Sequence, residues 1–415
     1  MGLGKTYTGS EKLRELNGLV NLVVCQKSKL EDWLNHFKNN YDFVVYDLTN
    51  KTDFSNFIKS SLQNTRSVAI INYELIFRRP EIARIHIDTL MLDESSMIQN
   101  EQAKRSKFIL KLNPNNVILL SGTPTSGKYE RLWSQAKLLG WSISKTLYWN
   151  QYVNYHIDTR QGFPLKIIDG YKNVERLKQK LREHGAQFLK TDEVMTLPEQ
   201  TFIDSFVPNT KEYRKFKKDG IIKLYNNKEY KDSDFESDFF GTTDTSGVIE
   251  LVGDTALTKM LYERQLCGMY CSDKLNAFRD LLESTEDRLI VFYNFTSEYE
   301  KLWKISQEYE KPRSVVNGSK KDLSNYEQYC NSVTFVQYQS GAMGLNLQKA
   351  NKIIYFTPPL SCENWMQSQK RIHRIGQSKA CFYYRLICKN SVEERIYDAL
   401  ARGVDYTDKL FERGE

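Results

Sequence analysis

The residues best suited to chemistry stand at the start of the chain. Residues 1–6 are Met-Gly-Leu-Gly-Lys-Thr, a glycine-rich turn followed by helix-forming residues. Gly2 and Gly4 would let backbone N–H groups close around phosphate oxygens, and the N-terminus of the next helix adds its positive dipole end. Lys5 would reach the outer phosphates and Thr6 would hold Mg²⁺. The turn indicates a phosphate-binding loop, although so short a pattern also occurs by chance.

Two adjacent carboxylates, Asp93 and Glu94, follow the apolar run 89–92. Acidic groups at the end of a buried strand are costly unless they meet a cation or hydrogen-bond donors. Together with a phosphate loop they indicate Mg²⁺-nucleotide chemistry, in which Asp93 supports the metal and Glu94 orients and deprotonates the attacking water. The alternative for one of the two acids is an N-cap of the following helix.

A third group lies far along the chain. Gln367, Arg371 and Arg374 are three or four residues apart, which places them on one face of a helix predicted over 361–375. Guanidinium groups can stabilise the charge that develops on a transferring phosphoryl group, an effect worth roughly 10³ to 10⁵ in rate. The alternative is a surface helix with ordinary basic residues.

Short loops follow two other runs of strand character. Ser121 and Thr123 come directly after one run, and Gly341 and Gly344 come shortly after another. In parallel sheets ligands gather at the carboxyl ends of the strands, so both loops are candidate binding segments. The two glycines could let the backbone approach a ligand closely or could form a tight turn.

An alternation of apolar runs and helical stretches provides the scaffold for these residues. It extends from Thr6 to Leu120, and a second alternating unit begins near Ser272 and ends in a helix after Ser391. This order is typical of parallel sheets with helices on their faces. The sequence therefore predicts an α/β protein with two parallel-sheet domains.

The regular alternation stops between the two units. Residues 129–184 are rich in aromatic side chains and predict an inserted helical subdomain, whose aromatics at this density belong to a core more often than they stack on bases. Residues 232–247 are acidic and rich in Ser, Thr and Gly, which predicts a flexible loop. The expected parts are domain 1 (1–128), the insertion and linker region (129–271), domain 2 (272–402) and a tail (403–415).

The composition of the 415-residue chain is that of an ordinary globular protein, with 59 Lys and Arg against 52 Asp and Glu. This modest basic excess is compatible with a polyanionic partner and equally with a solvated basic surface. Its seven cysteines form no Cys-x-x-Cys pair and have no His at ligand spacing, which predicts a reducing compartment and no structural metal. Cys267 and Cys271, one helical turn apart, predict a buried helix face. The sequence lacks an apolar run of membrane-spanning length, and we expect a cytoplasmic protein without membrane contact.

In their order along the chain, these motifs resemble the Swi/Snf-type ATPases of helicase superfamily two. Motif VI is the most specific match. The matching segments are 1–6 (motif I), 93–96 (II), 121–125 (III), 289–295 (IV), 341–347 (V) and 367–377 (VI), with 24–28 and 71–74 similar to motifs Ia and Ib.

The resemblance implies two RecA-like domains of the P-loop NTPase type, with ATP and Mg²⁺ in their cleft and double-stranded DNA across both. It implies a monomeric helicase-like motor that hydrolyses ATP to translocate on or remodel DNA. Nucleotide contacts are expected from Gly2, Gly4, Lys5, Thr6 and Gly344, metal contacts from Thr6 and Asp93, and catalysis from Lys5, Asp93, Glu94, Gln367, Arg371 and Arg374. Nucleic-acid contacts are expected from Lys27, Ser28, Tyr73, Asn294, Gly341 and Asn346, with Ser121 and Thr123 coupling the two sites.

Two departures from the family pattern leave alternatives open. The family's Asp-Glu-Ala-His or Asp-Glu-Gly-His is Asp-Glu-Ser-Ser here, which keeps the acids and loses the His. The strand before motif I and the segment that holds adenine in the family precede the point at which this sequence begins. The alternatives are a nucleic-acid-binding module that no longer hydrolyses ATP and an RNA-acting relative. Abundant Lys, Asn and Tyr predict an AT-rich genome, phage or bacterial.

Overall fold

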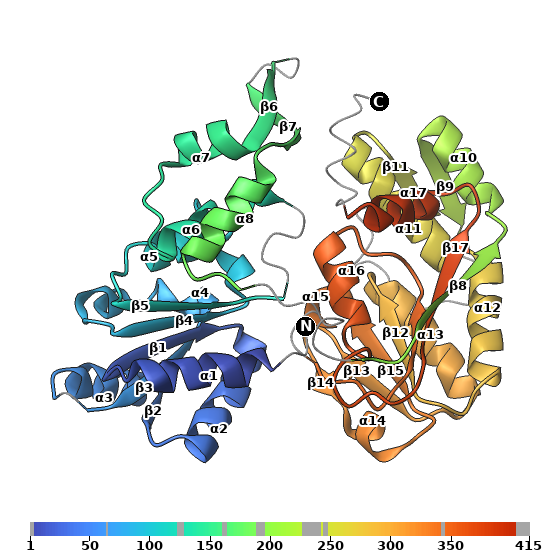
Figure 1. The fold of residues 1–415 in the computed structure, drawn as a ribbon. Coiled ribbons are helices and arrows are strands. Elements are labelled where there is room, and N and C mark those ends of the chain that lie inside the picture. The colour runs from blue at the N-terminus through green and yellow to red at the C-terminus, as the bar shows by residue number, and fades with distance from the viewer. Residues whose placement is uncertain are drawn as a thin grey trace. The chain divides into compact units, whose positions relative to one another are not determined.

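The computed structural model describes residues 4–63, 65–122, 128–159, 164–187, 196–225, 242–243, 248–341 and 345–403. The chain divides into two compact units, Met1–Met195 (unit 1) and Thr196–Glu415 (unit 2), whose helices and strands are labelled in Figure 1. Several predicted features lie outside the described residues: Gly2, Thr123, Gly344, the loop 232–247 except for 242–243, and the tail 403–415 except for Gly403.

Unit 1 contains a five-stranded sheet in the order β2-β3-β1-β4-β5, in which all neighbours are parallel. The strands are β1 (Val20–Cys25), β2 (Val44–Asp47), β3 (Ser67–Asn72), β4 (Thr89–Asp93) and β5 (Asn116–Leu120). Strands β1 and β3 are buried at every position. Because helices cover both faces, these strands appear in the sequence as continuous apolar runs.

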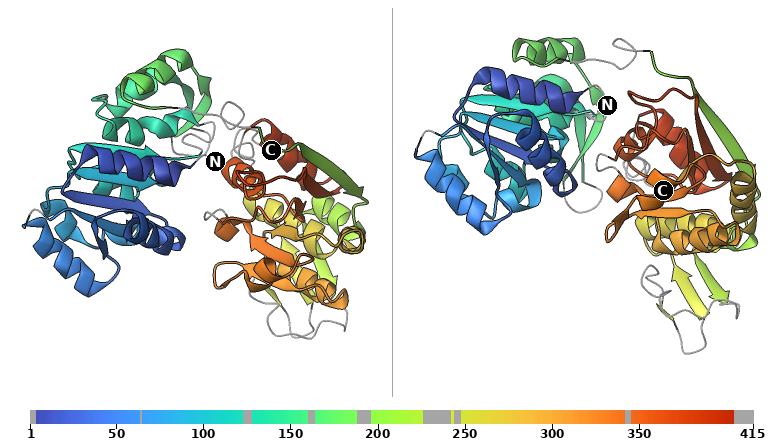
Figure 2. Two further views of the ribbon diagram at one scale, coloured as in Figure 1. Left: turned by 60° about the horizontal axis from the view of Figure 1, so that its bottom comes forward. Right: turned by 90° about the horizontal axis from the view of Figure 1, so that it is seen from below.

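Helices pack on both faces of this sheet, as two further views show (Figure 2). On one face Leu13 and Trp33 join Val23 in a core that α1 (Lys5–Leu16) and α2 (Leu30–Asn40) cover. On the other face Phe57 and Ile109 join Val24 in a second core. The elements on or beside this second face are α3 (Lys51–Ser61), α4 (Tyr73–Ile76), α5 (Lys104–Ile109) and the 3-10 turns η2 (Pro80–Arg84) and η3 (Ser95–Ile98), while η1 (Lys27–Lys29) leads into α2.

The segment after β5 contains a hairpin that the sequence analysis did not predict. Its elements are η4 (Tyr129–Leu132), α6 (Trp133–Leu138), α7 (Lys145–Tyr152), β6 (Val153–Asp158), β7 (Leu165–Tyr171) and α8 (Val174–Glu183). Strands β6 and β7 pair antiparallel, so this segment contains a hairpin beside the predicted helices; β-branched residues in both strands favour extended backbone. Tyr148 and Tyr152 are buried in a core with Leu177, as expected for aromatics of a core.

Unit 2 contains a seven-stranded sheet in the order β14-β13-β15-β12-β16-β17-β8, parallel except for β14. The strands are β8 (Gln200–Val207), β12 (Leu289–Tyr293), β13 (Arg313–Val316), β14 (Lys321–Asp322), β15 (Val333–Gln337), β16 (Lys352–Tyr355) and β17 (Cys381–Cys388). Strand β8 pairs with β17 along its whole length. The division between units consequently falls after Met195, whereas the sequence analysis begins domain 2 at 272, because this pairing joins segments far apart in the chain.

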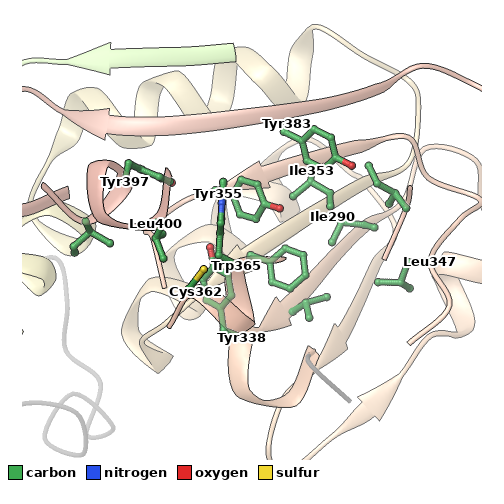
Figure 3. Close-up of a cluster of buried hydrophobic side chains, with 14 of the residues drawn as sticks. Ile290, Tyr338, Leu347, Ile353, Tyr355, Cys362, Trp365, Tyr383, Tyr397 and Leu400 are labelled. Carbon is green, nitrogen blue, oxygen red and sulfur yellow. The ribbon is translucent and has the colours of Figure 1, made fainter. Parts of the chain in front are cut away.

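Helices also cover both faces of the second sheet. One face carries α12 (Ser272–Glu283) and α13 (Thr296–Glu308), and the other carries α14 (Ser324–Gln328), α15 (Tyr338–Gly341), α16 (Cys362–Gln369) and α17 (Val392–Ala401). In the core under α16 and α17, Tyr355 lies between Trp365 and Tyr383 (Figure 3). These large buried rings join the sheet to the helices that follow it.

A small antiparallel sheet completes unit 2. It contains β9 (Ile221–Tyr225), β10 (Thr242–Thr243) and β11 (Val248–Val252) in the order β10-β11-β9, next to α10 (Lys211–Asp219) and α11 (Ala256–Met269). Phe216 and Leu266 bury the contact between this sheet and its helices. Among the described residues, no helix combines the length and the apolar character needed to cross a bilayer.

A buried carboxylate determines how α11 and α13 pack. Glu298 accepts hydrogen bonds from the backbone N–H groups of Asn294 and Phe295 and from the Thr357 hydroxyl. Gly268 on α11 lies against this carboxylate, since a Cβ there would be 2.1 Å from Glu298 Oε1. Because three donors hold the carboxylate in place, only glycine fits at this position.

We expect Gly268→Ala to lower the free energy of unfolding by about 1–3 kcal/mol, because the added methyl group overlaps a side chain that cannot move away. Urea denaturation with a fluorescence readout measures the change. Gly318→Ala is the matched control, because a Cβ there has no heavy atom within 4 Å. Equal midpoints for the two variants would contradict this packing.

Candidate active site

The first turn of α1 presents backbone donors. Gly4 is its N-cap and has φ of 72°, a left-handed conformation that glycine adopts without strain. The first N–H groups of a helix have no partner within the helix, and their dipoles favour an anion. Lys5 and Thr6 stand in this turn, and their contacts with phosphate and Mg²⁺ stay predictions.

The structure brings Lys5 to Glu94, which lies 89 residues away in the sequence. Lys5 Nζ donates to Glu94 Oε1 at 3.1 Å, and both side chains are mostly buried. The second oxygen, Glu94 Oε2, is buried without a hydrogen-bond partner. A buried carboxylate oxygen with no donor can accept a proton or hold a water molecule, which is what a general base needs.

Asp93 is the last residue of β4 and lies next to this pair. Burial raises the pKa of its carboxyl, and a hydrogen bond from Trp33 Nε1 at 2.9 Å opposes the shift. A bound cation would relieve the cost of the buried charge. Carboxylate and hydroxyl oxygens are the ligands that Mg²⁺ prefers, so the donor set of Asp93 and Thr6 fits this ion.

Tyr73 does not lie on the surface, where a nucleic-acid contact was expected. It is fully buried, and its hydroxyl donates to the backbone oxygen of Asp93 at 2.9 Å. Glu94 follows with φ of 53°, an uncommon left-handed conformation for a non-glycine residue. The Tyr73 hydroxyl therefore supports the backbone of the acidic loop, which is the turn that carries Asp93 and Glu94. This corrects its expected role as a nucleic-acid contact.

A second support of the acidic loop was missed by sequence reasoning. Ser95 Oγ donates to Gln135 Oε1 at 2.9 Å, and both residues are buried. Gln135 belongs to α6, so this bond ties the loop after β4 to the segment that follows the sheet. The sequence around Gln135 contains no motif that could have indicated this pairing.

The remaining predicted positions of unit 1 gather at one edge of the sheet. Lys27 and Ser28 follow β1, and Ser121 follows β5. Because these strands are parallel to β4, their carboxyl ends meet at the edge that carries Asp93. Lys27 is exposed, whereas Ser28 Oγ is buried without a hydrogen-bond partner.

In unit 2 the predicted arginine helix is shorter than expected. Helix α16 ends at Gln369, and Arg371 and Arg374 lie in the turns that follow. Gln377 holds these turns, because its Nε2 donates to the carbonyl groups of Gln348, Ala350 and Ile372. The prediction of one helix face over 361–375 was therefore wrong.

The guanidinium groups of Arg371 and Arg374 nevertheless share one hydrogen-bond acceptor. Arg371 Nη1 and Arg374 Nη1 both donate to the backbone oxygen of Leu345, at 3.3 and 3.4 Å. The side-chain oxygen of the buried Gln367 accepts a further bond from Arg371 at 3.5 Å, and the Gln367 amide donates to Glu363. A tertiary contact with the segment after α15 thus brings Gln367, Arg371 and Arg374 together.

Arg374 is partly exposed, whereas Arg371 is buried. Burial lowers the pKa of its guanidinium, and its Nε is buried without a hydrogen-bond partner. A buried donor on a cation is expensive to leave unpaired. An anionic oxygen, such as that of a phosphate, would satisfy it.

The other predicted positions of unit 2 differ in exposure. Asn346 is exposed and Gly341 ends α15. The amide of Asn294 donates within the unit, to Thr357 Oγ1 at 2.8 Å and to the Pro358 carbonyl at 3.1 Å. A nucleic-acid contact by Asn294 remains a prediction, and its observed role is to fix the loop after β16.

Comparison with known protein families matches almost the whole chain. The model of the SNF2-related domain matches residues 1–268, and the model of the helicase conserved C-terminal domain matches residues 273–376. The chain belongs to the SNF2-related family. The resemblance to Swi/Snf-type ATPases is thereby confirmed, together with the α/β class with two RecA-like parallel-sheet domains.

Relatives of this SNF2-related chain come from animals, yeast and bacteria. A SWI/SNF-related matrix-associated actin-dependent regulator of chromatin (subfamily A member 1) of Mus musculus is 24% identical, over 96% of this chain and 40% of that protein. The DNA repair and recombination protein RAD26 of Saccharomyces cerevisiae is 24% identical, over 96% of this chain and 38% of that protein. An uncharacterized ATP-dependent helicase of Mycoplasma genitalium is 24% identical, over 95% and 38%. The chain thus spans about 40% of the length of such curated relatives.

A solved structure is also similar to this SNF2-related chain. The Sulfolobus solfataricus SWI2/SNF2 ATPase core in complex with dsDNA is 18% identical, covers 97% of this chain and 85% of that one, and has a TM-score of 0.40. The SNF2-related domain model extends into α11, although the segment from Thr196 onward belongs to the second compact unit. Sequence family and spatial packing therefore divide this chain at different places.

Tyr73→Phe removes the hydroxyl that supports the acidic loop of this SNF2-related chain. We expect the free energy of unfolding to fall by about 1 kcal/mol, because the Asp93 carbonyl loses its donor in a buried place. Urea denaturation measures the loss. Tyr7→Phe, at a position with 63% exposure, is the control and should leave stability unchanged. A Tyr73→Phe variant as stable as the Tyr7→Phe variant would refute the supporting role.

Proposed function

We propose that this chain is a DNA-dependent ATPase that hydrolyses Mg²⁺-ATP in order to translocate on or remodel double-stranded DNA. The observation that carries the proposal is the Lys5–Glu94 pair beside Asp93, with Glu94 Oε2 buried and without a partner. Membership of the SNF2-related family supports the same activity.

Each polar group has a defined task in this proposal. The N–H groups after Gly4 and the Lys5 ammonium bind the phosphates, and Thr6 and Asp93 hold Mg²⁺. When bound, Mg²⁺ would neutralise charge on the phosphate oxygens. Glu94 releases Lys5 to the nucleotide and accepts a proton from the attacking water.

The arginines supply the positive charge that the transition state needs. Arg371 and Arg374 stabilise the transferring phosphoryl group, and Gln367 orients Arg371 through its side-chain oxygen. Their shared contact with Leu345 supports this role, because it keeps both guanidinium groups in one place. Gly4 and Gly344 complete the nucleotide contacts.

Nucleic acid is bound through its backbone. The candidate contacts are Lys27, Ser28, Ser121, Thr123, Asn294, Gly341 and Asn346. Contacts of this kind carry no base information, so binding is independent of sequence and weakens with salt. The net charge of +7 is compatible with a polyanionic partner.

We further propose a monomer that works in the cytoplasm. All seven cysteines are free, which supports a reducing compartment. A phage or bacterial source stays a prediction from composition.

The test is steady-state ATP hydrolysis by the 415-residue chain with and without duplex DNA. We expect duplex DNA to stimulate turnover, the stimulation to fall with salt, and Glu94→Gln to reduce turnover by about 10²-fold or more while DNA binding persists. Glu15→Gln is the matched control, since Glu15 is 70% exposed.

Other outcomes separate the alternatives. DNA binding without hydrolysis by the wild-type chain would overturn the ATPase and favour a binding module. Stimulation by RNA in place of duplex DNA would overturn the choice of substrate and favour an RNA-acting relative. Wild-type turnover by Glu94→Gln would remove Glu94 from the reaction.

A further inference from the structure

Helix α10 of unit 2 presents a row of cations to the solvent. Lys211, Lys215 and Lys218 are spaced by four and three residues, and Arg214 stands beside Lys215. At these spacings the four side chains share one face of the helix, and all four are exposed. We call these four residues the basic stripe.

The opposite face of α10 fixes the helix to the rest of unit 2. Tyr213 and Phe216 are fully buried in the core beneath the helix. The Tyr213 hydroxyl accepts a hydrogen bond from the Val392 N–H at 2.8 Å, and Lys217 Nζ donates to the backbone oxygen of Asn390 at 3.1 Å. The basic stripe therefore stands on a helix that is anchored to the turn between β17 and α17.

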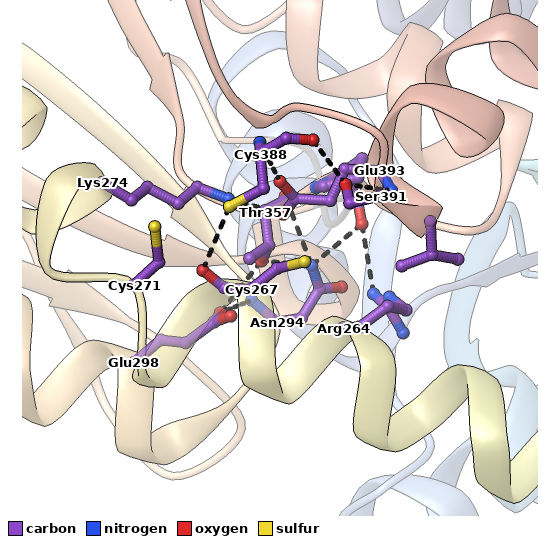
Figure 4. Close-up of polar contacts among 12 residues, drawn as sticks. Arg264, Cys267, Cys271, Lys274, Asn294, Glu298, Thr357, Cys388, Ser391 and Glu393 are labelled. Atoms are coloured by element: carbon purple, nitrogen blue, oxygen red, sulfur yellow. Dashed lines mark hydrogen bonds and ion pairs between the residues drawn. The ribbon is translucent and has the colours of Figure 1, made fainter. Parts of the chain in front are cut away.

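This turn adds a further cation, Lys389, which is exposed. Polar contacts at both of its ends hold the turn in place (Figure 4). The Cys388 N–H donates to Glu393 Oε2 at 2.9 Å, and Ser391 Oγ donates to the Cys388 carbonyl at 2.6 Å. Asn209, two residues before α10, donates from its side chain to the Lys389 carbonyl at 3.1 Å. The backbone that carries Lys389 is thus fixed next to the start of α10.

These cations are not neutralised within the protein. Among the residues that the structure describes, neither the basic stripe nor Lys389 takes part in an ion pair, and the two acids of α10, Glu212 and Asp219, lie to one side of the stripe. Like charges three and four residues apart repel each other, and Lys211 in the first turn opposes the helix dipole. The stripe therefore destabilises its own helix, so a role in folding does not explain it.

The topology places these cations at the edge of the sheet where candidate nucleic-acid contacts lie. Strands β12, β16, β17 and β8 are parallel neighbours in that order, and α10 follows β8 while Lys389 follows β17. Asn294 follows β12 at the same carboxyl edge. Strand β8 is three strand spacings from β12, or about 14 Å. The cations thus continue the edge that begins at Asn294.

We propose that the basic stripe and Lys389 contact the phosphate backbone of duplex DNA and extend the DNA-binding surface along this edge. From Lys211 to Lys218 the helix rises by about 10 Å, which matches about three phosphates of one strand at 3.4 Å of duplex axis each. Flexible lysines on an anchored helix bind phosphates without reading bases. The inference rests on the proposed function and adds contacts that lie outside the motifs of the sequence analysis.

The test is binding of a fluorescently labelled duplex DNA to the 415-residue chain, measured by anisotropy without ATP between about 50 and 200 mM salt. We expect Lys215→Gln/Lys218→Gln to weaken binding by roughly 10-fold or more at low salt and to lower the slope of log affinity against log salt by about two, because each lost phosphate contact removes about 0.9. Lys215→Arg/Lys218→Arg keeps the charge and should bind like the wild type.

The matched control removes the same charge from the opposite edge of the same sheet. Lys349→Gln/Lys379→Gln changes two exposed lysines that precede β16 and β17, and it should bind DNA like the wild type. Urea denaturation should show that Lys215→Gln/Lys218→Gln is at least as stable as the wild type, since repulsion within α10 is relieved.

Three results would overturn the inference. Equal DNA affinity and salt slope for Lys215→Gln/Lys218→Gln and for the control would remove α10 from the DNA-binding surface and leave the proposed function standing. A loss of affinity confined to RNA, with duplex DNA binding unchanged, would assign the stripe to another partner. A wild-type chain that binds no duplex DNA would overturn this inference together with the proposed function.

Discussion

The interaction on which unit 1 depends is the ion pair between Lys5 and Glu94 at the carboxyl edge of a buried parallel sheet. It requires that α1 lie close to the sheet, and Gly9 permits this: a Cβ there would be 2.7 Å from Leu120 Cδ1. It also requires that the chain turn sharply after β4, which it does through the left-handed backbone of Glu94 above the Tyr73 hydroxyl. The close packing of α1, the backbone conformation of Glu94 and the buried Tyr73 hydroxyl thus all position the Lys5–Glu94 ion pair.

In unit 2, backbone carbonyl groups position the charged side chains. Here two cations must be held near one another with few anions, and the backbone carbonyl of Leu345 accepts from both Arg371 and Arg374. Turns held by the Gln377 amide fix the chain that carries them. The interior of the same unit contains Glu298 and Glu393, and each carboxylate accepts a hydrogen bond from a backbone N–H group.

Sequence reasoning succeeded where function depends on local pattern. Apolar runs between helical stretches predicted both parallel sheets, and the order of short motifs predicted the family. It failed where distant segments meet: the pairing of β8 with β17, the bond from Ser95 to Gln135 and the burial of Tyr73 have no local signal. The prediction of a helix over 361–375 failed for a related reason. Tertiary hydrogen bonds hold the turns after Gln369, where α16 ends, although residue spacing favours a longer helix.

The central proposal is that Lys5 binds the nucleotide and that Arg374 accelerates its hydrolysis. The most direct measurement compares ATP binding with single-turnover hydrolysis for Arg374→Ala and Lys5→Ala, with Lys379→Ala, an exposed neighbour, as control. The account predicts that Arg374→Ala binds ATP like the wild type but hydrolyses it about 10³-fold more slowly, whereas Lys5→Ala loses binding. Turnover like that of the wild type in Arg374→Ala would contradict it.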